Sequence, residues 1–489
     1  MSKKFLNTEI LVEAGTKMLQ MVSNKFEEIE QLKFPVVPKV QPGFLRQQFS
    51  EKPPLEPESL DIILQETEKK IFPGLTLWSH PNFFAYYPSN ITHASIIAEI
   101  FASAFGTPGF QWLASPAQTE LENIVVDWMV YGLDLPSKFL MKNQGGGTIA
   151  GTVSDAIFIS VHVAKRRKMK QLNINTDSAK VCKFVGYYVE SAHACATKAL
   201  HLKDIYYQKK LPIIFNETLQ NYIVDIEKTI EIIEQDINEG LIPFWLSCSF
   251  GTTGTCAFDP LDQLGEICKK YQIWFNVDAA YAGSSWIINE YREKAIGLEL
   301  ADSIEVNFAK LMMCGLTGSL FYVNDKNELA EAMGNKIDFE IYKNKFTENY
   351  DVWDYKDWQV ALGKRFNSIK MFWMIKSLGL NGMREQILQK IEVAKHFEQL
   401  VRSSNRFKIF TKPQLGLVTF LLVHEDLSTQ NKLNRRLQEL INENTLLGFI
   451  SGSEIKGIFY LRVSIANHTT TKENVEHFWN HILKLTEQL

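Results

Sequence analysis

The sequence predicts an α/β fold in which helices cover both faces of a mostly parallel β-sheet. Short β-rich apolar runs alternate with helical stretches from about residue 86 to 375, and such alternation is typical of a parallel sheet. The length of 489 residues also exceeds what one small core needs. We expect an N-terminal helical arm at 1–85, a large domain at 86–375 and a small C-terminal α/β domain at 376–489.

The N-terminal arm begins with a predicted amphipathic helix at 8–31, because apolar side chains recur there on one face. The segment that follows contains the prolines Pro35, Pro38, Pro42, Pro53, Pro54 and Pro57. Proline continues neither a helix nor a central strand, so this segment is expected to be an extended connector. Such an arm has little core of its own, and a second subunit is a plausible surface for its apolar face.

Both expected α/β domains contain sequence runs that are typical of strands and helices. The strands predicted in the large domain are 184–189, 244–249, 273–277, 303–307 and 319–323. The helices predicted between several of them are 156–170, 224–239 and 261–271. A long helix at 367–403 leads to the small domain, where we expect strands near 415–423 and 457–466 and helices at 427–444 and 471–487.

Composition excludes several classes of protein. A net charge of −4 gives no electrostatic argument for binding nucleic acid or an anionic membrane, and the basic cluster at 165–170 is interpreted as a solvated helix end. The six cysteines form no CxxC pair, which argues against a disulfide framework and against a metal site. No apolar run reaches the roughly 18 residues that span a bilayer, and no secretory signal is visible. We therefore expect a cytoplasmic protein.

A glycine-rich run is the first candidate for ligand binding. Residues 144–148 lead through 151–154 into a predicted helix. Glycine lets the backbone approach a ligand, and a helix N-terminus favours phosphate. The run lacks the Gly-Lys-Ser/Thr ending of a P-loop, so a plain turn with a helix cap explains it equally well.

Three side chains that follow predicted strands are the next candidates, since ligands of open α/β sheets bind beyond the carboxyl ends of strands. Asp278 is either a helix cap or the charge partner of a cationic ring nitrogen, beside small alanines that admit a flat ring. Lys310 has apolar neighbours, and it is either a snorkelling lysine or a desolvated amine nucleophile. His193 is either structural or stacked on a planar cofactor.

Together these features match the requirements of pyridoxal phosphate. That cofactor needs a phosphate cradle, a carboxylate at its ring nitrogen, a stacking side chain and a lysine that forms a Schiff base. The chain offers the glycine run, His193, Asp278 and Lys310 in that order. The combination is far more specific than any single part, so we expect a pyridoxal-phosphate enzyme whose Schiff-base lysine is Lys310.

The sequence resembles the group II pyridoxal-phosphate decarboxylases, in particular the aromatic-L-amino-acid decarboxylase family, nearly from end to end. The most specific block is residues 277–283, and 354–366 is almost as good. The other matching blocks are 42–45, 78–81, 84–88, 115–122 and the glycine run. The resemblance implies pyridoxal-phosphate fold type I, which is aspartate-aminotransferase-like, and an obligate homodimer with shared active sites.

Matching positions carry cofactor roles over from the family. Lys310 becomes the Schiff-base lysine, and Asp278 the partner of the pyridine nitrogen. His193 is expected to stack on the ring with Ala280 on its opposite face, and Thr253 to lie nearby. The residues expected to hold the phosphate are Val153, Ser154 and Asn307.

The resemblance also implies a substrate pocket and a catalytic loop. The pocket residues are Trp78, Tyr86, Ser89, Pro108, Phe110 and Gly363, with Phe110 reaching in from the other subunit. Tyr342 aligns best with the loop tyrosine that reprotonates the carbanion, and Tyr350 is its competitor. A tyrosine there favours simple decarboxylation, whereas a phenylalanine is found in related enzymes that form aldehydes.

Two positions depart from the family pattern. Ala309 replaces a histidine expected beside the phosphate, and Pro108 replaces an aliphatic pocket residue. Gly363 leaves room for a large aromatic ring, so the expected substrate is DOPA, 5-hydroxytryptophan, tryptophan, tyrosine or phenylalanine, and the expected products are the arylalkylamine and CO2. An aromatic acetaldehyde synthase on the same scaffold and a non-catalytic cofactor-binding paralogue remain alternatives.

Overall fold

The computed structural model describes residues 6–334 and 352–489. They fall into two compact units. The first unit combines both ends of the chain and comprises Met1–Pro88, Gln399–Lys408 and Leu421–Leu489, whereas the second comprises Ser89–Glu398 and Ile409–Phe420. The organisation into regions 1–85, 86–375 and 376–489 stays a prediction.

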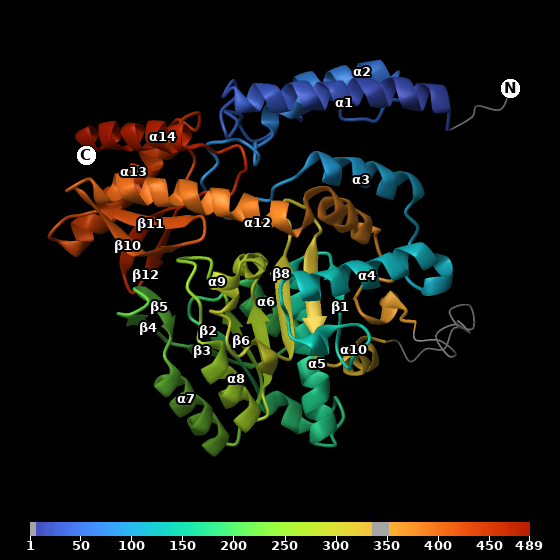
Figure 1. Ribbon diagram of the computed structural model, residues 1–489, viewed down its shortest axis with the longest axis vertical. Coiled ribbons are helices and arrows are strands. Elements are labelled where there is room, and N and C mark those ends of the chain that lie inside the picture. Colours follow the sequence, from blue (N-terminus) through green and yellow to red (C-terminus); the bar gives the residue numbers. More distant parts are fainter. Residues whose placement is uncertain (1–5, 335–351) are drawn as a thin grey trace. The chain divides into compact units, whose positions relative to one another are not determined.

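The second unit contains a seven-stranded sheet with the order β1-β9-β8-β7-β6-β2-β3 (Figure 1). Its strands are β1 (Gly146–Ala150), β2 (Phe184–Val189), β3 (Tyr207–Leu211), β6 (Ile242–Ser249), β7 (Trp274–Asp278), β8 (Ser303–Asn307) and β9 (Ser319–Val323). The pairs from β3 through β2, β6 and β7 to β8 are parallel, and β9 is antiparallel to both β8 and β1. Therefore β1 runs with the parallel strands, and all strands except β9 end at one edge, called the carboxyl edge below. The predicted mostly parallel sheet is confirmed.

Helices lie on both faces of this sheet. The longer helices of the second unit are α3 (His93–Phe105), α4 (Pro116–Gly132), α5 (Val153–Gln171), α6 (Cys195–Leu202), α7 (Ile226–Asn238), α8 (Leu261–Lys270) and α10 (Lys326–Met333), together with most of α12 (Asn367–Arg402). On one face, Trp245 Nε1 of β6 donates a hydrogen bond to Ser160 Oγ of α5 at 3.2 Å. Side chains alternate along a strand, so Cys248 points to the other face. There Cys268 of α8 lies close enough to contribute to the raised pKa of Cys248. This is the two-sided covering that the sequence predicts.

Gly146 and Gly147 of the expected phosphate run belong to strand β1 rather than to a turn. A Cβ atom on Gly146 would lie 2.9 Å from Met141 Sδ, and one on Gly147 would lie 2.6 Å from side-chain atoms of Val126 and Tyr322. Contacts this close exclude any side chain. These glycines therefore serve core packing, and the connection between β1 and α5 begins only at Gly151.

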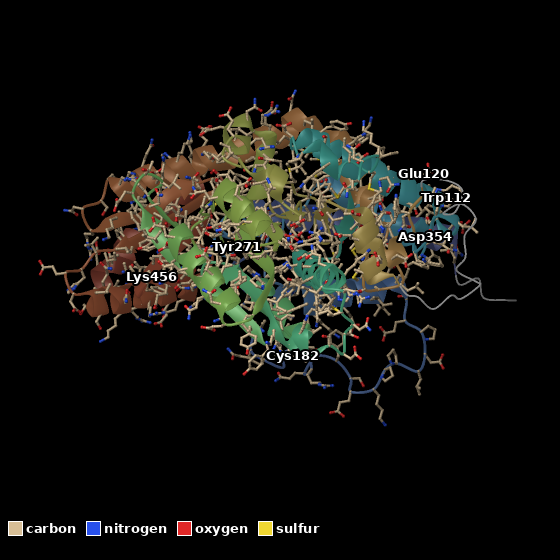
Figure 2. The ribbon with its side chains drawn as sticks, turned by 90° about the horizontal axis from the view of Figure 1, so that it is seen from below. Trp112, Glu120, Cys182, Tyr271, Asp354 and Lys456 are labelled. Atoms are coloured by element: carbon tan, nitrogen blue, oxygen red, sulfur yellow. The ribbon has the colours of Figure 1, made fainter. Side chains whose placement is uncertain are left out.

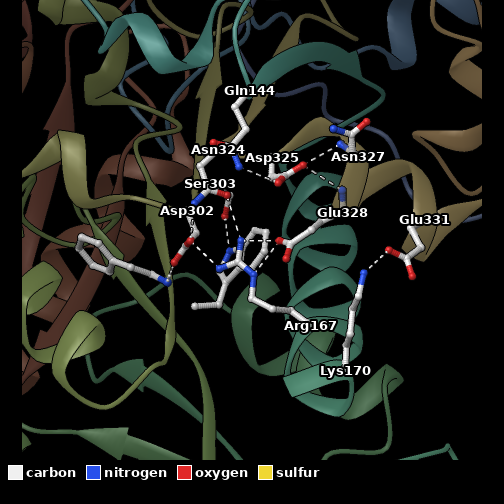
Figure 3. A network of polar contacts seen from close by, with 12 residues as sticks. Gln144, Arg167, Lys170, Asp302, Ser303, Asn324, Asp325, Asn327, Glu328 and Glu331 are labelled. Carbon is white, nitrogen blue, oxygen red and sulfur yellow. Dashed lines mark hydrogen bonds and ion pairs between the residues drawn. The ribbon is translucent and has the colours of Figure 1, made fainter. Parts of the chain in front are cut away.

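The basic end of α5 is less solvated than the sequence suggests. Arg167 forms ion pairs with Asp302 and Glu328, each at 2.6 Å (Figure 3). Lys168 is buried, whereas Lys170 is exposed and pairs with Glu331 at the surface. The expectation of a solvated helix end is wrong for Arg167 and Lys168, because this turn of the helix packs against the sheet and against α10.

The helix predicted at 8–31 is confirmed as α1 (Thr8–Glu30) in the first unit, where Asn7 caps it by accepting from the amides of Glu9 and Ile10. The short helix α2 (Leu60–Glu66) lies beside it, and Lys17 of α1 pairs with Asp61 at 2.8 Å. Among the described residues, no helix has both the length and the apolar character that a membrane crossing requires.

The C-terminal part of the chain forms a four-stranded sheet with the order β10-β11-β13-β12. Its elements are α12 (Asn367–Arg402), β10 (Phe407–Gln414), β11 (Leu417–Leu422), α13 (Leu427–Glu443), β12 (Ser451–Ile455), β13 (Ile458–Ser464) and α14 (Lys472–Leu485). The predicted long helix is interrupted at Gly379, which has φ 61° and ψ 172°. A small two-stranded sheet, β4 (Ile213–Asn216) and β5 (Asn221–Val224), was not predicted from the sequence.

Candidate active site

The carboxyl edge of the large sheet brings the main candidate segments together. Ala150 at the end of β1 pairs with Ser319, which pairs with Asn307 at the end of β8. The amide of Asn307 donates to the carbonyl of Ala280 at 3.1 Å, and Asp278 pairs with Ser249 of β6. The phosphate turn, Lys310, Asp278 and the turn after β6 therefore all begin at this edge.

The phosphate end of the site is the N-terminus of α5. Thr152 is the N-cap, and its hydroxyl oxygen accepts from the amide of Asp155. The amides of Val153 and Ser154 are the first two of the helix, so they have no acceptor within it. An N-terminus of this kind favours a phosphate, which is the role that the sequence predicts for these two residues.

Asp278 is the last residue of β7 and is only 9% exposed. Its Oδ1 accepts a hydrogen bond from the amide of Ala280 at 3.0 Å. Two residues of the expected ring site, the carboxylate and the small alanine beside it, are thus held in one turn.

Lys310 lies in a turn that Asn307 stabilises. Asn307 Oδ1 accepts from the amide of Ala309 at 2.9 Å, which leaves its NH2 group as the part that could reach a phosphate. Burial lowers the pKa of the Lys310 amine, and the nearby negative charge of Asp278 offsets part of that shift. A lysine of lowered pKa close to a carboxylate is suited to act as an amine nucleophile.

Asn90 is a residue of this site that the sequence did not reveal. Its amide donates to the carbonyl of Ala309 at 2.9 Å, and its side-chain NH2 donates to the carbonyl of Lys310 at 3.3 Å. These bonds hold Ser89 beside the lysine turn, and the hydroxyl oxygen of Ser89 is buried and without a hydrogen-bond partner among the described residues. These bonds are made to backbone carbonyls, so they do not depend on the side chain of Ala309, which stands where a histidine was expected.

His193 follows β2 and is exposed. Its Nδ1 accepts a hydrogen bond from the amide of Cys195 at 3.2 Å. An acceptor nitrogen carries no proton, so the neutral ring carries its proton on Nε2. The charge of Asp278 raises the pKa of the Cys195 thiol and the charge of Lys310 lowers it. Because Cys195 is close enough to interact with both groups, the segment of His193 lies at the same edge as Asp278 and Lys310.

The turn after β6 contains Thr253, which is exposed. Gly251 begins this turn with φ +95°, and a Cβ atom there would lie 2.5 Å from Cβ of Ala282. Only glycine tolerates both conditions. The turn therefore lies directly against the segment that follows Asp278.

Hydrogen bonds join residues 108–112 to residues 354–364 in the second unit, and these two segments are called the strip below. The strip contains three of the expected pocket residues, Pro108, Phe110 and Gly363. The carbonyl of Phe110 accepts from the amide of Lys356 at 2.9 Å, and the carbonyl of Pro108 accepts from the amide of Lys364 at 2.5 Å. A Cβ atom on Gly363 would be only in ordinary contact with Pro108, at 3.8 Å or more. Space for a larger group thus remains at Gly363.

The strip is anchored just outside the expected pocket residues. The amide of Trp112 donates to Asp354 Oδ1 at 3.0 Å, and the indole of Trp112 donates to Glu120 (Figure 2). The other expected pocket residues, Trp78 and Tyr86, lie in the first unit, where their rings stack with centroids 5.8 Å apart.

Two candidates for the catalytic loop, Tyr342 and Tyr350, fall outside the described residues.

A buried ion pair that the sequence did not reveal supports the phosphate end. Lys364 Nζ lies 3.0 Å from Glu122 Oε1, and the two side chains are 4% and 1% exposed. Glu122 also accepts from the hydroxyl of Thr148 and the amide of Ile149, both in β1. The pair therefore fixes the strand that leads into α5. Its two members are far apart in the sequence, so no local pattern could have indicated it.

The groups at the carboxyl edge fit pyridoxal phosphate. The N-terminus of α5 provides unpaired amides for the phosphate, and the buried carboxylate of Asp278 is suited to a cationic ring nitrogen. Lys310 provides an amine of lowered pKa.

Comparisons with known proteins agree with this site. The family described as the pyridoxal-dependent decarboxylase conserved domain matches residues 42–423. Tryptophan decarboxylase 2 of Oryza sativa subsp. japonica is 36% identical over 97% of this chain and 94% of that protein. Phenylacetaldehyde synthase of Arabidopsis thaliana is also 36% identical, over 98% of this chain and 96% of that protein. The crystal structure of Oryza sativa TDC with PLP and tryptamine superposes with a TM-score of 0.95 at 29% identity and covers 100% of this chain and 99% of that one.

Fold and site together define a pyridoxal-phosphate-dependent enzyme of fold type I. The match over most of the chain then specifies the family. This protein belongs to the pyridoxal-dependent decarboxylases, which makes it a carboxy-lyase that uses pyridoxal 5′-phosphate.

Proposed function

We propose that this enzyme removes the α-carboxyl group of an aromatic L-amino acid and releases the arylalkylamine and CO2. The observation that carries the proposal is the grouping of Lys310, Asp278 and the α5 N-terminus at one sheet edge. The relatives named above include a tryptophan decarboxylase. Gly363 supports a large side chain in the substrate, because the structure leaves space beside Pro108.

Each site residue has a proposed task. Pyridoxal phosphate supplies an electron-withdrawing ring that accepts the electron pair left when CO2 departs. Lys310 binds the cofactor covalently through its amine, and Asp278 keeps a proton on the ring nitrogen. His193, Ala280 and Thr253 would hold the cofactor ring.

The remaining residues bind phosphate and substrate. Val153, Ser154 and Asn307 hold the phosphate. Ser89, Pro108, Phe110 and Gly363 of the second unit are proposed to contact the substrate, whereas the pocket roles of Trp78 and Tyr86 in the first unit stay predictions from the sequence. From the sequence alone, Tyr342 returns a proton to the α-carbon, with Tyr350 as the competing candidate.

The test is a product assay on the purified enzyme with DOPA, 5-hydroxytryptophan, tryptophan, tyrosine and phenylalanine. Amine and CO2 in equal amounts are the expected products, and Lys310→Ala is expected to lose both turnover and the absorbance of the lysine-bound cofactor. The absence of amine from all five substrates would refute the proposal. A comparison of Tyr342→Phe with Tyr350→Phe assigns the loop tyrosine, because only one of the two changes should reduce amine formation.

An aldehyde synthase is the second candidate, since phenylacetaldehyde synthase is 36% identical to this chain. That reaction consumes O2 and water and yields aldehyde, CO2, ammonia and hydrogen peroxide. A peroxide assay alongside amine detection separates the two reactions. A non-catalytic paralogue is the third candidate, and it would bind stoichiometric cofactor without turning over any of the five substrates.

We also propose a homodimer with shared active sites, in which Phe110 contributes to the partner's pocket. Helix α1 supports this idea, because Ile10, Leu11 and Val12 are 50%, 58% and 67% exposed. Large exposed apolar side chains on one helix are typical of an interface. Analytical ultracentrifugation should give twice the mass of the chain, 56.1 kDa. The cytoplasm is the proposed location, since the six cysteines form no disulfide bond among the described residues.

A further inference from the structure

A second buried carboxyl group lies directly beside Asp278. Glu305 is the register partner of Asp278 in the parallel pair β7–β8, so both side chains point to the same face of the sheet. Glu305 is 0% exposed and Asp278 is 9% exposed. The two carboxyl groups are therefore neighbours on one face of the sheet, and both are poorly solvated.

The hydrogen bonds of Glu305 come from a chain of neutral groups within the sheet. Trp274 Nε1 donates to Ser303 Oγ at 2.8 Å, and the hydroxyl of Ser303 donates to Asn276 Oδ1 at 2.5 Å. The NH2 group of Asn276 then donates to Glu305 Oε2 at 3.1 Å. The other oxygen, Oε1, is buried and has no hydrogen-bond partner among the described residues.

No cation is among the charges that act on the carboxyl group of Glu305 in the part of the chain that the structure describes. Two ionised carboxylates held together in a poorly solvated site repel each other, and one of them then keeps a proton. Burial, and next the charge of Asp278, raise the pKa of Glu305 well above its ordinary value. Lys310, Cys195 and Cys248 are the other titratable groups that act on this pair.

The surroundings decide which carboxyl group carries the charge. Asp278 accepts a backbone N–H from Ala280 and is attracted by the amine of Lys310. Among the described residues, Glu305 interacts only with uncharged donors, the amide of Asn276 and its own backbone N–H, and it is more deeply buried. The negative charge is therefore better stabilised on Asp278 and the proton on Glu305.

We propose that Glu305 is a positioning residue that stays protonated and donates its carboxyl O–H to Asp278, so that the pair carries a single negative charge. The proposal rests on the proposed role of Asp278 at the ring nitrogen. A single negative charge on the pair balances the positive charge of one protonated ring nitrogen, whereas two negative charges would leave an uncompensated charge. Glu305 would also fix the orientation of the Asp278 carboxylate, which the backbone amide of Ala280 holds from one side only.

The test compares holoenzymes of the wild type, Glu305→Gln, Glu305→Leu and Asp278→Asn by infrared spectroscopy and by cofactor affinity. Asp236→Asn is the matched control, because Asp236 is a buried carboxylate that is paired with Lys209 and accepts from the hydroxyl of Tyr187. The wild type should show the C=O stretch of a protonated carboxylic acid, which Glu305→Gln should lose and Asp236→Asn should keep.

The affinities provide the second readout. A glutamine can donate the same hydrogen bond without charge, so Glu305→Gln should keep the dissociation constant of pyridoxal phosphate within about twofold. Glu305→Leu removes a hydrogen bond to a charged group and should weaken binding on the order of 10-fold.

Two results would overturn the inference. One is the same infrared spectrum for the wild type and Glu305→Gln, and the other is a loss of affinity in Glu305→Gln as large as that in Glu305→Leu. The role of Asp278 is tested separately. If Asp278→Asn binds the cofactor as tightly as the wild type, the proposed ring partner is wrong, whatever the protonation state of Glu305.

Discussion

Replacing Lys364 by methionine should destabilise the enzyme strongly, because the change leaves the carboxylate of Glu122 buried and unpaired. At the observed separation of 3.0 Å, two unit charges attract each other by about 5.5 kcal/mol at an effective dielectric constant of 20, before desolvation. Removing one partner of a buried pair costs about 3–5 kcal/mol. If all 489 residues unfold together, the melting temperature should fall by about 3–5 °C.

The measurement is thermal unfolding of the wild type and Lys364→Met under identical conditions. Lys170→Met is the matched control, because Lys170 and Glu331 form an exposed pair at 2.7 Å with side chains 68% and 59% exposed. Such a pair contributes about 0–1 kcal/mol, so the control should melt close to the wild type. If Lys364→Met melts no lower than Lys170→Met, the buried pair does not stabilise the strand that leads to the phosphate site.

Two further changes probe burial and backbone geometry. Burial lowers the pKa of Lys390 from 10.5 to about 7, and within the described residues its amine donates a hydrogen bond to the carbonyl of Leu311. The unfolded chain binds the proton more readily between these values, so stability should rise with pH from 7 towards 10. Lys390→Met should therefore stabilise the protein by a few kcal/mol at pH 7 and progressively less at higher pH. Urea unfolding of the wild type and Lys390→Met at several pH values measures this difference in the free energy of unfolding. A difference that is the same at every pH would contradict the prediction. Gly251→Ala should lower the free energy of unfolding by about 1–3 kcal/mol, because φ is +95° there and the new Cβ would lie 2.5 Å from Cβ of Ala282. Gly382→Ala is the control. Its Cβ would meet nothing closer than 3.5 Å, so this change should be neutral or stabilising in the same urea experiment.

Most of the large sheet could be predicted from the sequence, because its strands are short apolar runs between amphipathic helices. The predicted strand at 303–307 coincides with β8, and that at 273–277 differs from β7 by one residue at each end. Strand β1 was not predicted, since its two glycines resemble a turn locally. Their role comes from side chains of distant segments that leave no space for a Cβ atom, and such tertiary contacts leave no local pattern.

The candidate site shows the same division between local and distant information. Asp278 and Lys310 were found because each follows an apolar strand, and Asp278 also lies in the most specific family block, residues 277–283. Asn90 and Glu305 were not singled out, because an asparagine in a loop and a glutamate in a strand carry no signal by themselves. Their importance depends on strand register and on hydrogen bonds to the lysine turn, which only the structure provides.

The most direct test of the central claim is the chemical identification of the lysine that binds the cofactor. Borohydride reduction of the holoenzyme fixes the pyridoxyl group to its lysine, and peptide mass spectrometry then locates it. The account predicts that the label lies on Lys310, with one label for each chain. A label on any other lysine would contradict the assignment of the active site.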